Sequence, residues 1–521
     1  MFNLVDRFVD RHLAEGRGGK AAIRCGDAVL TYAEVAAAVN RAGNGLLSLG
    51  LQEEQRVLLV LPDCPEFAIA FFGVMKTGAV AVPTSTAART ADYDYFLTES
   101  RARILIVHST LYAEVAPALA TQTRLRHVIV AGEPQAGCLH WDEWLRGHSP
   151  ELEATRTSKN DPAFWLWTSG STGPPKAAVH LHQDWIHCCE NYGVGVLGIG
   201  EDDVTFSSSK LFHAYGLGNG LMFPFYAGAT TVLFSGKPQA RAILEVARNA
   251  RPTVFFSVPT LYAQMLQEAT LQEATPQEGG RESFPLDSLR LAVSAAEPLP
   301  AEIFRRWQRR FGIEILDGIG STEVLHIYLS ARPGEVKPGS TGRAVPGYEL
   351  RIVDPAGKDV APGTIGDLLV AGASTALCYW NRRELTADRM RGRWFFTGDK
   401  YWMDADGDYW YAGRCDDMFR VSGQWVSPAE VENALMGHAS VLEAAVVAYQ
   451  EESELHTPKA FVVLRSGMEA TPGLAYELQE FVKQRITPYK YPRRIEFLAE
   501  LPKSAAGKLL RYKLRGNDAA G

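Results

Sequence analysis

The chain has 521 residues, of which 46% are hydrophobic and 22% are charged, and its formal net charge is −7. This length suits a large α/β enzyme with more than one domain, and the composition is ordinary for a globular protein. The slight acidity argues against nucleic acid as the main partner. The apolar runs 67–75 and 79–83 are too short to span a bilayer, and the charged segment 1–13 is not a signal peptide, so no membrane partner is expected.

Strand-like and helix-like segments alternate over most of the chain. Residues 56–61 read as a buried strand, and residues 65–77 follow with helical periodicity that Gly78 is expected to end. Further short strands are predicted at 104–107, 128–130, 230–233, 254–256 and 291–293. Such alternation predicts parallel sheets covered by helices on both faces.

The sequence changes in character towards the C-terminus. Residues 271–283, rich in Gln, Glu and Gly, are predicted to be a surface insertion, and the Asp-Ala-Asp-Gly-Asp run at 404–408 is typical of a hairpin tip. A new alternation of elements follows Gly413, so we expect one domain over 1–413 and a second over 414–521. In the second domain the sequence predicts helices at 428–436 and 474–485 and strands at 444–448 and 460–464.

The seven cysteines are scattered, at positions 25, 64, 138, 188, 189, 378 and 415, and none forms a Cys-x-x-Cys pair. In a chain of this size that predicts reduced thiols and a cytoplasmic location. The adjacent Cys188 and Cys189, with three histidines close by in sequence, leave a metal or redox site as an alternative, although their spacing fits no standard zinc pattern.

A loop at 167–176, Trp-Thr-Ser-Gly-Ser-Thr-Gly-Pro-Pro-Lys, lies between two apolar runs. Its glycines permit positive φ angles and a close approach of the backbone, so its N–H groups and hydroxyls can surround phosphate oxygens. It is not a Walker A loop, because the Gly-Lys-Ser/Thr ending is missing. The loop therefore predicts a phosphate site of another type.

Four further motifs fit the same chemistry. They are Asp-Gly-Ile-Gly-Ser-Thr-Glu at 317–323, Phe-Thr-Gly-Asp at 396–399, Gly-Arg at 413–414 and Pro-Lys-Ser-Ala-Ala-Gly-Lys at 502–508. Attack of a carboxylate on the α-phosphate of ATP brings two anions together. It needs cations and backbone dipoles at the phosphates, a carboxylate for Mg²⁺ and a group that holds the ribose.

With these motifs in this order over nearly the whole chain, the sequence resembles the adenylate-forming acyl- and aryl-CoA synthetases. Within them it is most similar to benzoate-CoA ligases, including aminobenzoate- and hydroxybenzoate-CoA ligases, through residues 210–219, 318–327 and 489–493. The resemblance implies an α/β fold: a large N-terminal domain of mostly parallel sheets covered by helices plus a small barrel-like part, with a smaller mobile α+β C-terminal domain. It also implies aroyl-AMP formation and then aroyl-CoA formation, with ATP, Mg²⁺ and coenzyme A.

The resemblance assigns roles around the nucleotide. Lys508 would bridge the carboxylate and phosphate oxygens, Thr322 would bind the α-phosphate, Glu323 would bind Mg²⁺, Asp399 the ribose hydroxyls, and Asp416 would be the hinge. The remaining residues implied to bind ATP or coenzyme A are Thr168, Ser169, Gly170, Ser171, Thr172, Gly173 and Lys176 at the phosphates, Ala295, Ala296, Glu297, Asp317, Gly318 and Ile319 at the adenine, Arg414 beside the ribose and phosphate, Tyr411, and Val421, Ser422 and Gly423 along the pantetheine tunnel.

Small residues dominate the implied pocket for the acid. Its lining candidates are His213, Ala214, Tyr215, Gly216, Val258, Ala295, Gly318, Gly320, His326 and Ile327. Such a lining suits a flat ring better than a long alkyl chain. Many benzoate-CoA ligases carry Phe where this chain has His213. The imidazole either hydrogen-bonds to an amino or hydroxy substituent on the ring or serves only as an aromatic wall.

Several alternatives stay open. Ser207 and Lys210 match the Ser-x-x-Lys motif of serine hydrolases, but no partner motif follows. The final acceptor is coenzyme A or the same pantetheine arm on a carrier protein, which the motifs do not separate. A non-catalytic nucleotide sensor would have little use for Lys508. The expected partners are thus a small aromatic acid and coenzyme A, and a homodimer remains open.

Overall fold

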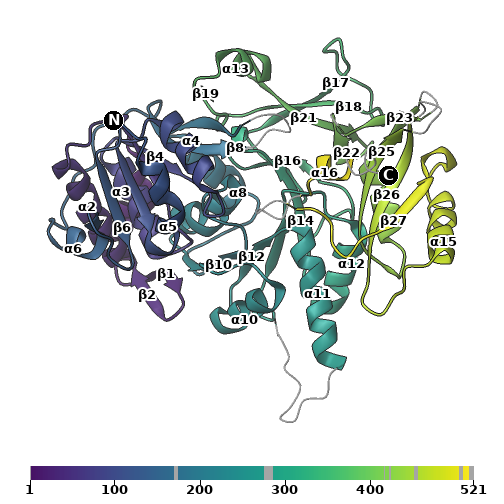
Figure 1. The fold of residues 1–521 in the computed structure, drawn as a ribbon, viewed down its shortest axis with the longest axis horizontal. Helices are drawn as coiled ribbons and strands as arrows, with labels where there is room; N and C mark the ends of the chain where they lie inside the picture. Colours follow the sequence, from purple (N-terminus) through teal and green to yellow (C-terminus); the bar gives the residue numbers. More distant parts are fainter. Residues whose placement is uncertain are drawn as a thin grey trace.

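Two large, mostly parallel sheets form most of the N-terminal part of the computed structural model (Figure 1), which describes residues 2–168, 174–274, 286–415, 417–421, 424–450, 456–503 and 509–515. The first sheet has eight strands, in the order β19-β9-β8-β4-β3-β5-β6-β7. These strands are β3 (Arg56–Val60), β4 (Val80–Pro83), β5 (Ile104–His108), β6 (His127–Ala131), β7 (Leu139–His140), β8 (Pro162–Thr168), β9 (Lys176–Leu181) and β19 (Cys378–Tyr379). β9 pairs antiparallel with both β8 and β19, whereas the other pairs are parallel.

The second sheet has nine strands, in the order β16-β15-β14-β13-β12-β10-β11-β1-β2. These are β1 (Ala21–Cys25), β2 (Ala28–Thr31), β10 (Val204–Ser207), β11 (Thr230–Leu233), β12 (Val254–Ser257), β13 (Leu291–Ser294), β14 (Ile315–Gly320), β15 (Ile327–Ser330) and β16 (Arg343–Ala344). Its central pairs are parallel, so the carboxyl ends of β12, β13 and β14 lie at one edge of the sheet.

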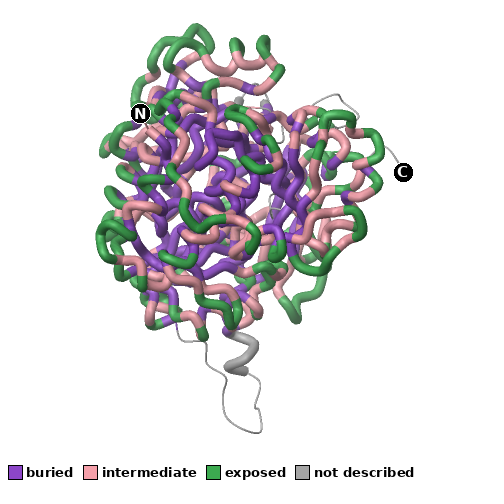
Figure 2. The backbone as a smooth tube through the Cα atoms, turned by 90° about the vertical axis from the view of Figure 1, so that its left-hand side faces the viewer, coloured by how far each residue is buried: buried purple, intermediate pink, exposed green. Residues whose placement is uncertain are grey.

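Helices cover both sheets. In the N-terminal part they are η1 (Asp6–Asp10), α1 (Arg11–Ala14), α2 (Tyr32–Ser48), α3 (Pro65–Lys76), α4 (Thr90–Ser100), α5 (Ser109–Leu119), α6 (Trp141–Arg146), α7 (Asp184–Cys188), η2 (Cys189–Val194), α8 (Ala214–Leu217), η3 (Gly218–Met222), α9 (Phe223–Ala227), α10 (Ala240–Ala250), α11 (Pro259–Ala274), α12 (Ala301–Phe311), η4 (Thr322–Val324) and α13 (Arg383–Arg389). Buried residues fill the interior of the molecule, and exposed residues lie on its outer turns (Figure 2).

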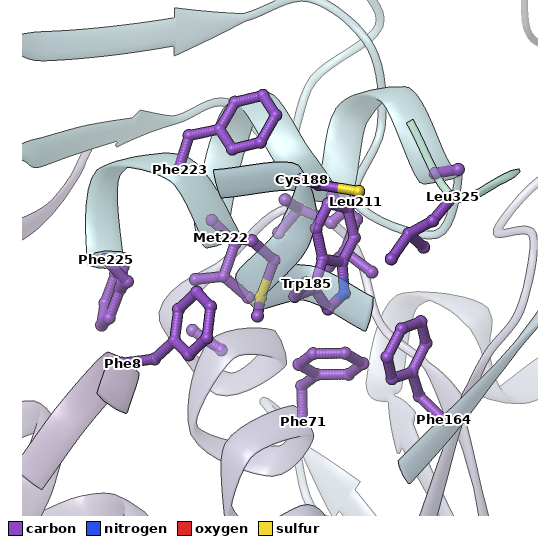
Figure 3. Packing of buried hydrophobic residues seen from close by; sticks show 14 of the residues in the cluster. Phe8, Phe71, Phe164, Trp185, Cys188, Leu211, Met222, Phe223, Phe225 and Leu325 are labelled. Carbon is purple, nitrogen blue, oxygen red and sulfur yellow. The ribbon is translucent and has the colours of Figure 1, made fainter. Parts of the chain in front are cut away.

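The core between the sheets explains the apolar sequence of α3. Phe71 packs on Phe164 of β8 (Figure 3). Phe72 packs on Phe225 of α9, which lies against the nine-stranded sheet. Because both sides of α3 are covered, even Lys76 is buried, and its ammonium group lies 2.7 Å from Asp10. A buried charge needs such a partner.

The rest of the chain forms an antiparallel sheet and an α+β C-terminal part. The sheet holds β17 (Glu349–Val353), β18 (Gly366–Ala371), β20 (Met390–Arg391), β21 (Trp394–Met403) and β22 (Tyr409–Arg414). The C-terminal part holds β23 (Phe419–Val421), β24 (Gln424–Val426), α14 (Pro428–Met436), β25 (Val441–Gln450), β26 (His456–Leu464), α15 (Pro472–Lys483), η5 (Pro488–Lys490), β27 (Arg494–Phe497) and α16 (Tyr512–Arg515). It contacts the N-terminal part through α12 and β22 (Figure 1).

The predicted fold class is confirmed, and the antiparallel sheet is the expected small barrel-like part. Each strand and helix predicted above coincides with an observed element to within a few residues. Of the predicted insertion at 271–283, residues 271–274 extend α11, and residues 275–283 lie outside the described part. Within the described part, no helix is both long and apolar enough to cross a membrane.

Candidate active site

The predicted phosphate loop begins and ends at the mouth of a hairpin. Thr168 is the last residue of β8, Lys176 is the first of β9, and the two face each other in the antiparallel register. The intervening Ser169, Gly170, Ser171, Thr172 and Gly173 lie outside the described residues. The Nζ atom of Lys176 lies 5.9 Å from the centroid of the Tyr379 ring, which β19 places beside β9.

Tyr379 also contacts the predicted magnesium ligand. Its hydroxyl donates a hydrogen bond of 2.6 Å to Oε1 of Glu323. Burial, and then the Glu323 carboxylate, raise the pKa of Tyr379, so the hydroxyl keeps its proton and acts as the donor. One oxygen of Glu323 is thereby held in place.

The turn that carries Thr322 and Glu323 is fixed through its main chain. The carbonyl of Thr322 lies 2.8 Å from Nε2 of His180, that of Glu323 accepts from the amide of Ala376 at 2.7 Å, and that of Val324 accepts from Oγ of Ser374 at 2.8 Å. Leu325, which follows directly, has a φ of 74°, a strained conformation for a branched side chain. Two separate segments, β9 and the segment 374–376, therefore hold one turn.

Asp399 and Arg414 lie opposite each other on β21 and β22. Nη1 of Arg414 donates to Oδ1 of Asp399 at 2.9 Å and to the carbonyl of Thr397 at 3.0 Å. Gly398 has a φ of 76°, and a Cβ there would lie 2.9 Å from Nη2 of Arg414. The glycine of this motif therefore leaves room for the guanidinium group beside the aspartate.

Glu323, Asp399 and Arg414 all affect the pKa of one buried hydroxyl, that of Tyr328. Its hydroxyl is buried and has no hydrogen-bond partner among the described residues. Burial first, and then Asp399 and Glu323, raise the pKa of Tyr328, whereas Arg414 lowers it, so these three charges act on one hydroxyl. Tyr411 also raises the pKa of Tyr328. Its ring packs edge-on against that of Tyr401 of β21, with the ring centroids 5.4 Å apart.

The predicted adenine wall consists of residues 295–297, directly after β13, and residues 317–319, in the second half of β14. Ser294 pairs with Asp317 in the parallel register, and Ala295, Ala296 and Glu297 come next. Oδ1 of Asp317 is buried without a hydrogen-bond partner in the described part, and burial raises the pKa of this carboxyl group. Because unpaired buried polar groups cost about 1–3 kcal/mol each, this atom and the Tyr328 hydroxyl suit a polar ligand such as a nucleotide.

The candidate pocket for the acid is built on glycines. A Cβ at Gly216 would lie 2.2 Å from the carbonyl oxygen of Lys210, and one at Gly320 would lie 2.5 Å from that of His326. Gly318 is almost as crowded, with Ile327 at 3.0 Å from such a Cβ. No side chain fits at the first two positions, so the backbone itself forms part of the wall.

Aromatic residues form the other walls. The Tyr215 hydroxyl lies 3.1 Å from the carbonyl oxygens of both Ser257 and Val293, which fixes its ring between β12 and β13. His326 is buried behind it, with Nε2 at 3.4 Å from the Tyr215 carbonyl, and burial lowers the pKa of His326 to about 3. Ala214 begins α8 beside Tyr215, and Val258 follows β12.

His213 precedes α8, and its ring lies 4.4 Å from that of Phe212. Burial lowers the pKa of His213 to about 4, so the imidazole is neutral near pH 7. A neutral imidazole can donate from one nitrogen and accept at the other. Among the described residues, its ring nitrogens have no hydrogen-bond partner.

Four of the C-terminal candidates lie outside the described residues: Asp416, Ser422, Gly423 and Lys508. Val421 ends β23. The amide of Leu509, the residue after Lys508, donates to Oε1 of Glu297 at 2.8 Å. Leu509 therefore contacts the predicted adenine wall.

The two rival sites lack the necessary contacts. The Lys210 ammonium donates to the carbonyls of Phe234 and Gly236, at 2.7 and 2.8 Å, and not to a serine hydroxyl. Cys188 and Cys189 contact the Tyr348 hydroxyl and the Met222 carbonyl. Within the described part, no cluster of three or more His, Cys, Asp or Glu side chains is arranged to hold a metal ion.

Sequence reasoning missed Tyr379 and His180 as parts of the site. They contact Glu323 and Thr322 across sequence separations of 56 and 142 residues. No local motif marks either residue, and His180 drew notice only as a neighbour of the cysteines. Their role becomes visible only when β9 and β19 are placed beside the turn after β14.

Two family models match the chain: AMP-binding enzyme over residues 10–380, and AMP-binding enzyme C-terminal domain over residues 430–508. The chain belongs to the AMP-binding enzyme family. Among its relatives in this family, a benzoate–CoA ligase from Thauera aromatica is 46% identical, with 99% of this chain and 96% of that protein covered. A 4-hydroxybenzoate–CoA/benzoate–CoA ligase from Rhodopseudomonas palustris is 44% identical, with 99% and 94% covered.

Solved structures of this family show the same fold. An anthranilate CoA ligase in complex with anthranoyl-AMP superimposes with a TM-score of 0.93 at 40% identity, over 98% of this chain and 96% of that chain. A benzoate CoA ligase from Burkholderia xenovorans LB400 superimposes with a TM-score of 0.90 at 43% identity, over 99% and 100%.

Proposed function

We propose that the protein is an ATP-dependent aryl-CoA ligase acting on a benzoate-type acid: benzoate, 2-aminobenzoate or hydroxybenzoate. The observation that carries the proposal is a pair of carboxylates held by hydrogen bonds, Glu323 by the Tyr379 hydroxyl at 2.6 Å and Asp399 by Arg414 at 2.9 Å, whose charges both raise the pKa of the buried Tyr328 hydroxyl. Two carboxylates and a cation around a site with unpaired buried polar atoms suit a nucleotide with its metal. The relatives that act on benzoate, 4-hydroxybenzoate and anthranilate support an aromatic acid as the substrate.

In the first step, a carboxylate oxygen of the acid attacks the α-phosphorus of ATP, and pyrophosphate leaves. Asp399 would accept hydrogen bonds from the ribose hydroxyls. Arg414 supports this role, because it holds one oxygen of the Asp399 carboxylate. Thr322 would bind the α-phosphate, and Lys176 with the loop 169–173 would bind the pyrophosphate end. Mg²⁺, when bound at Glu323, would neutralise phosphate charge.

In the second step, the sulfur of coenzyme A attacks the acyl carbon, AMP leaves, and the thiol loses its proton. We infer that residues 414–521 form a separate domain that turns about Asp416 between the two steps. Lys508 would face the carboxylate and α-phosphate in the first step, and Val421, Ser422 and Gly423 would line the pantetheine path in the second. Large domain turns of this kind are a known class of conformational step.

Pyrophosphate release over a panel of benzoate, aminobenzoates, hydroxybenzoates and medium-chain fatty acids tests the proposal. We expect release with one or more of the aromatic acids, and aroyl-CoA by mass spectrometry when coenzyme A is the only acceptor. Release without aroyl-CoA, together with loading of a phosphopantetheinylated carrier protein, would make the protein a carrier-protein loading enzyme. No release with any aromatic acid would refute the assignment.

Two finer expectations belong to this proposal. We place the reaction in the cytoplasm, which the seven free cysteines support. A homodimer is the second expectation, and size-exclusion chromatography with light scattering tests it.

A further inference from the structure

His180 and Asp184 form a completely buried pair beside the turn that carries Thr322 and Glu323. His180 lies on β9 and Asp184 begins α7, and neither side chain is exposed to solvent. Nδ1 of His180 lies 3.0 Å from Oδ2 of Asp184, and Nε2 lies 2.8 Å from the carbonyl oxygen of Thr322. The imidazole therefore joins a buried carboxyl group to the main chain of the turn.

The contacts of the ring decide which atoms carry protons. A carbonyl oxygen only accepts, so Nε2 of His180 must carry a proton and donate to Thr322. At Nδ1, either the imidazole donates to the carboxylate or a protonated Asp184 donates to the imidazole. Both arrangements place two protons on the pair and leave it without net charge. A buried pair without net charge avoids the cost of an isolated charge.

Asp184 is held by the backbone as well. Its Oδ2 also accepts from the amide of Leu181 at 3.0 Å. The His180 ring stacks on Phe164 with centroids 5.2 Å apart and planes 13° apart, and Phe164 itself packs against Trp185 (Figure 3). The ring is therefore fixed both in its plane and along its hydrogen-bonding axis.

We propose that His180 is a positioning residue for adenylation, and that Asp184, through its hydrogen bond at Nδ1, keeps Nε2 protonated so that Nε2 donates to Thr322. This inference rests on the proposed function, because Thr322 and Glu323 would meet the α-phosphate and the metal there. The donor acts on the main chain between the two functional side chains. Movement of the Thr322 carbonyl would displace both of them together.

The three hydrogen bonds to the main chain of the turn come from two different parts of the fold. The amide of Ala376 and the hydroxyl of Ser374 belong to one segment that precedes β19, whereas His180 reaches the turn from the hairpin of the phosphate loop. His180 thus makes a direct hydrogen bond between β9, which begins at Lys176, and the turn. We infer that it sets the distance between the pyrophosphate end and the α-phosphate end of ATP.

Two opposite substitutions separate the hydrogen bond from the packing. His180→Phe keeps an aromatic ring on Phe164 and removes the donor, whereas His180→Gln keeps an amide donor close to the position of Nε2 and removes the ring. Both leave Asp184 without its imidazole, so that shared cost cancels in the comparison. His182→Phe is the matched control: His182 is equally buried, two residues away, and bonds to the amide of Leu4 instead of the turn.

The readouts are kcat and KM for ATP in pyrophosphate release, and the Kd for Mg–ATP by calorimetry without any acid. We expect His180→Phe to lose about tenfold or more in kcat/KM for ATP, since an unpaired buried carbonyl is costly. His180→Gln should stay within about threefold of the wild type, as should His182→Phe, even if its melting temperature falls. If His180→Phe does not fold, His180→Asn, whose shorter amide does not reach Thr322, replaces it.

The inference is overturned if His180→Phe keeps the wild-type kcat/KM, if His180→Gln loses as much as His180→Phe, or if His182→Phe loses the same amount. These outcomes are distinct from failure of the proposed function. If the wild type releases no pyrophosphate with any aromatic acid, the Kd values for Mg–ATP still rank the four proteins and test His180 by themselves.

Discussion

The hydroxyl of Tyr379 lies 2.6 Å from Oε1 of Glu323, while the ring of the same tyrosine lies beside the ammonium group of Lys176. One side chain thus contacts both the proposed metal ligand and the lysine of the phosphate loop. A hydrogen bond to a charged group contributes about 1.5–3 kcal/mol, more than a neutral one. The position of the Glu323 carboxylate therefore depends on Tyr379.

We predict that Tyr379→Phe raises the Mg²⁺ concentration needed for half-maximal pyrophosphate release by about tenfold, because Glu323 loses the donor that holds it. The phenyl ring still lies beside Lys176, so the KM for the acid should change little. Titration of the rate with Mg²⁺ measures the effect. Tyr93→Phe, which loses a hydroxyl bonded to the Ser85 carbonyl, is the control. An unchanged Mg²⁺ dependence would show that Tyr379 does not orient Glu323.

Lys508→Ala should lose aroyl-AMP formation by about 10²-fold or more, because a cation no longer stabilises charge between the carboxylate and the α-phosphate. The same variant should still convert supplied aroyl-AMP and coenzyme A to aroyl-CoA. The hydrogen bond from the amide of Leu509, the residue after Lys508, to Glu297 of the predicted adenine wall supports this difference. Equal losses in both half-reactions would argue against a C-terminal domain that presents different faces in turn.

The hairpin tip between β21 and β22 is closed by an ion cluster. Nζ of Lys337 lies 3.1, 2.8 and 2.6 Å from oxygens of Asp404, Asp406 and Asp408. Burial acts to raise the pKa of Asp404, but the backbone amide of Asp408, the Trp410 indole and Lys337 outweigh it and lower this pKa to about 2. A carboxyl group whose pKa is lower in the folded than in the unfolded state stabilises the fold at pH values above its ordinary pKa of 3.8. This contribution is lost as the pH falls through about 2.

Lys337→Met should therefore lower the melting temperature near pH 7, and the difference from the wild type should narrow as the pH falls from about 4 to about 2. Thermal unfolding followed by circular dichroism over this range measures it. Lys358→Met, at an exposed lysine with no ion pair among the described residues, should show no such pH dependence. A difference that stays constant down to pH 2 would show that the carboxylates are not coupled to Lys337.

The sequence predicted the strands well because their physical signal is local. β3 and β12 are short apolar runs that are each followed two residues later by a proline, and a strand buried on both faces needs little else. The Asp404–Asp408 turn was equally local, since its residues cap one another. The contacts that hold the candidate site were not predictable in this way. Tyr379–Glu323 and His180–Thr322 arise because β9 and β19 pair at the sheet edge nearest the turn, and that pairing is a property of the topology.

The substrate pocket shows the same limit at His213. The sequence left two roles open for this residue, a hydrogen-bonding partner for a ring substituent or an aromatic wall. The structure supplies a neutral imidazole, because burial lowers its pKa to about 4, and its ring nitrogens have no partner in the described part. A neutral imidazole without a protein partner is available to a polar substituent of the substrate.

We predict that an amino- or hydroxy-substituted benzoate is used at least as well as benzoate. At an apolar wall, the binding free energies of two rings that differ by one small substituent differ by only about 1–3 kcal/mol. If His213 is left unpaired by the unsubstituted ring, a further penalty of about 1–3 kcal/mol is added against benzoate. His213→Phe removes that penalty and should shift preference towards benzoate by about tenfold, equivalent to about 1.4 kcal/mol. The ratio of kcat/KM for 2-aminobenzoate, each hydroxybenzoate and benzoate measures the shift. If the variant keeps the wild-type ranking, His213 is an aromatic wall, and substrate choice must then depend on Val258, Ala295 or His326.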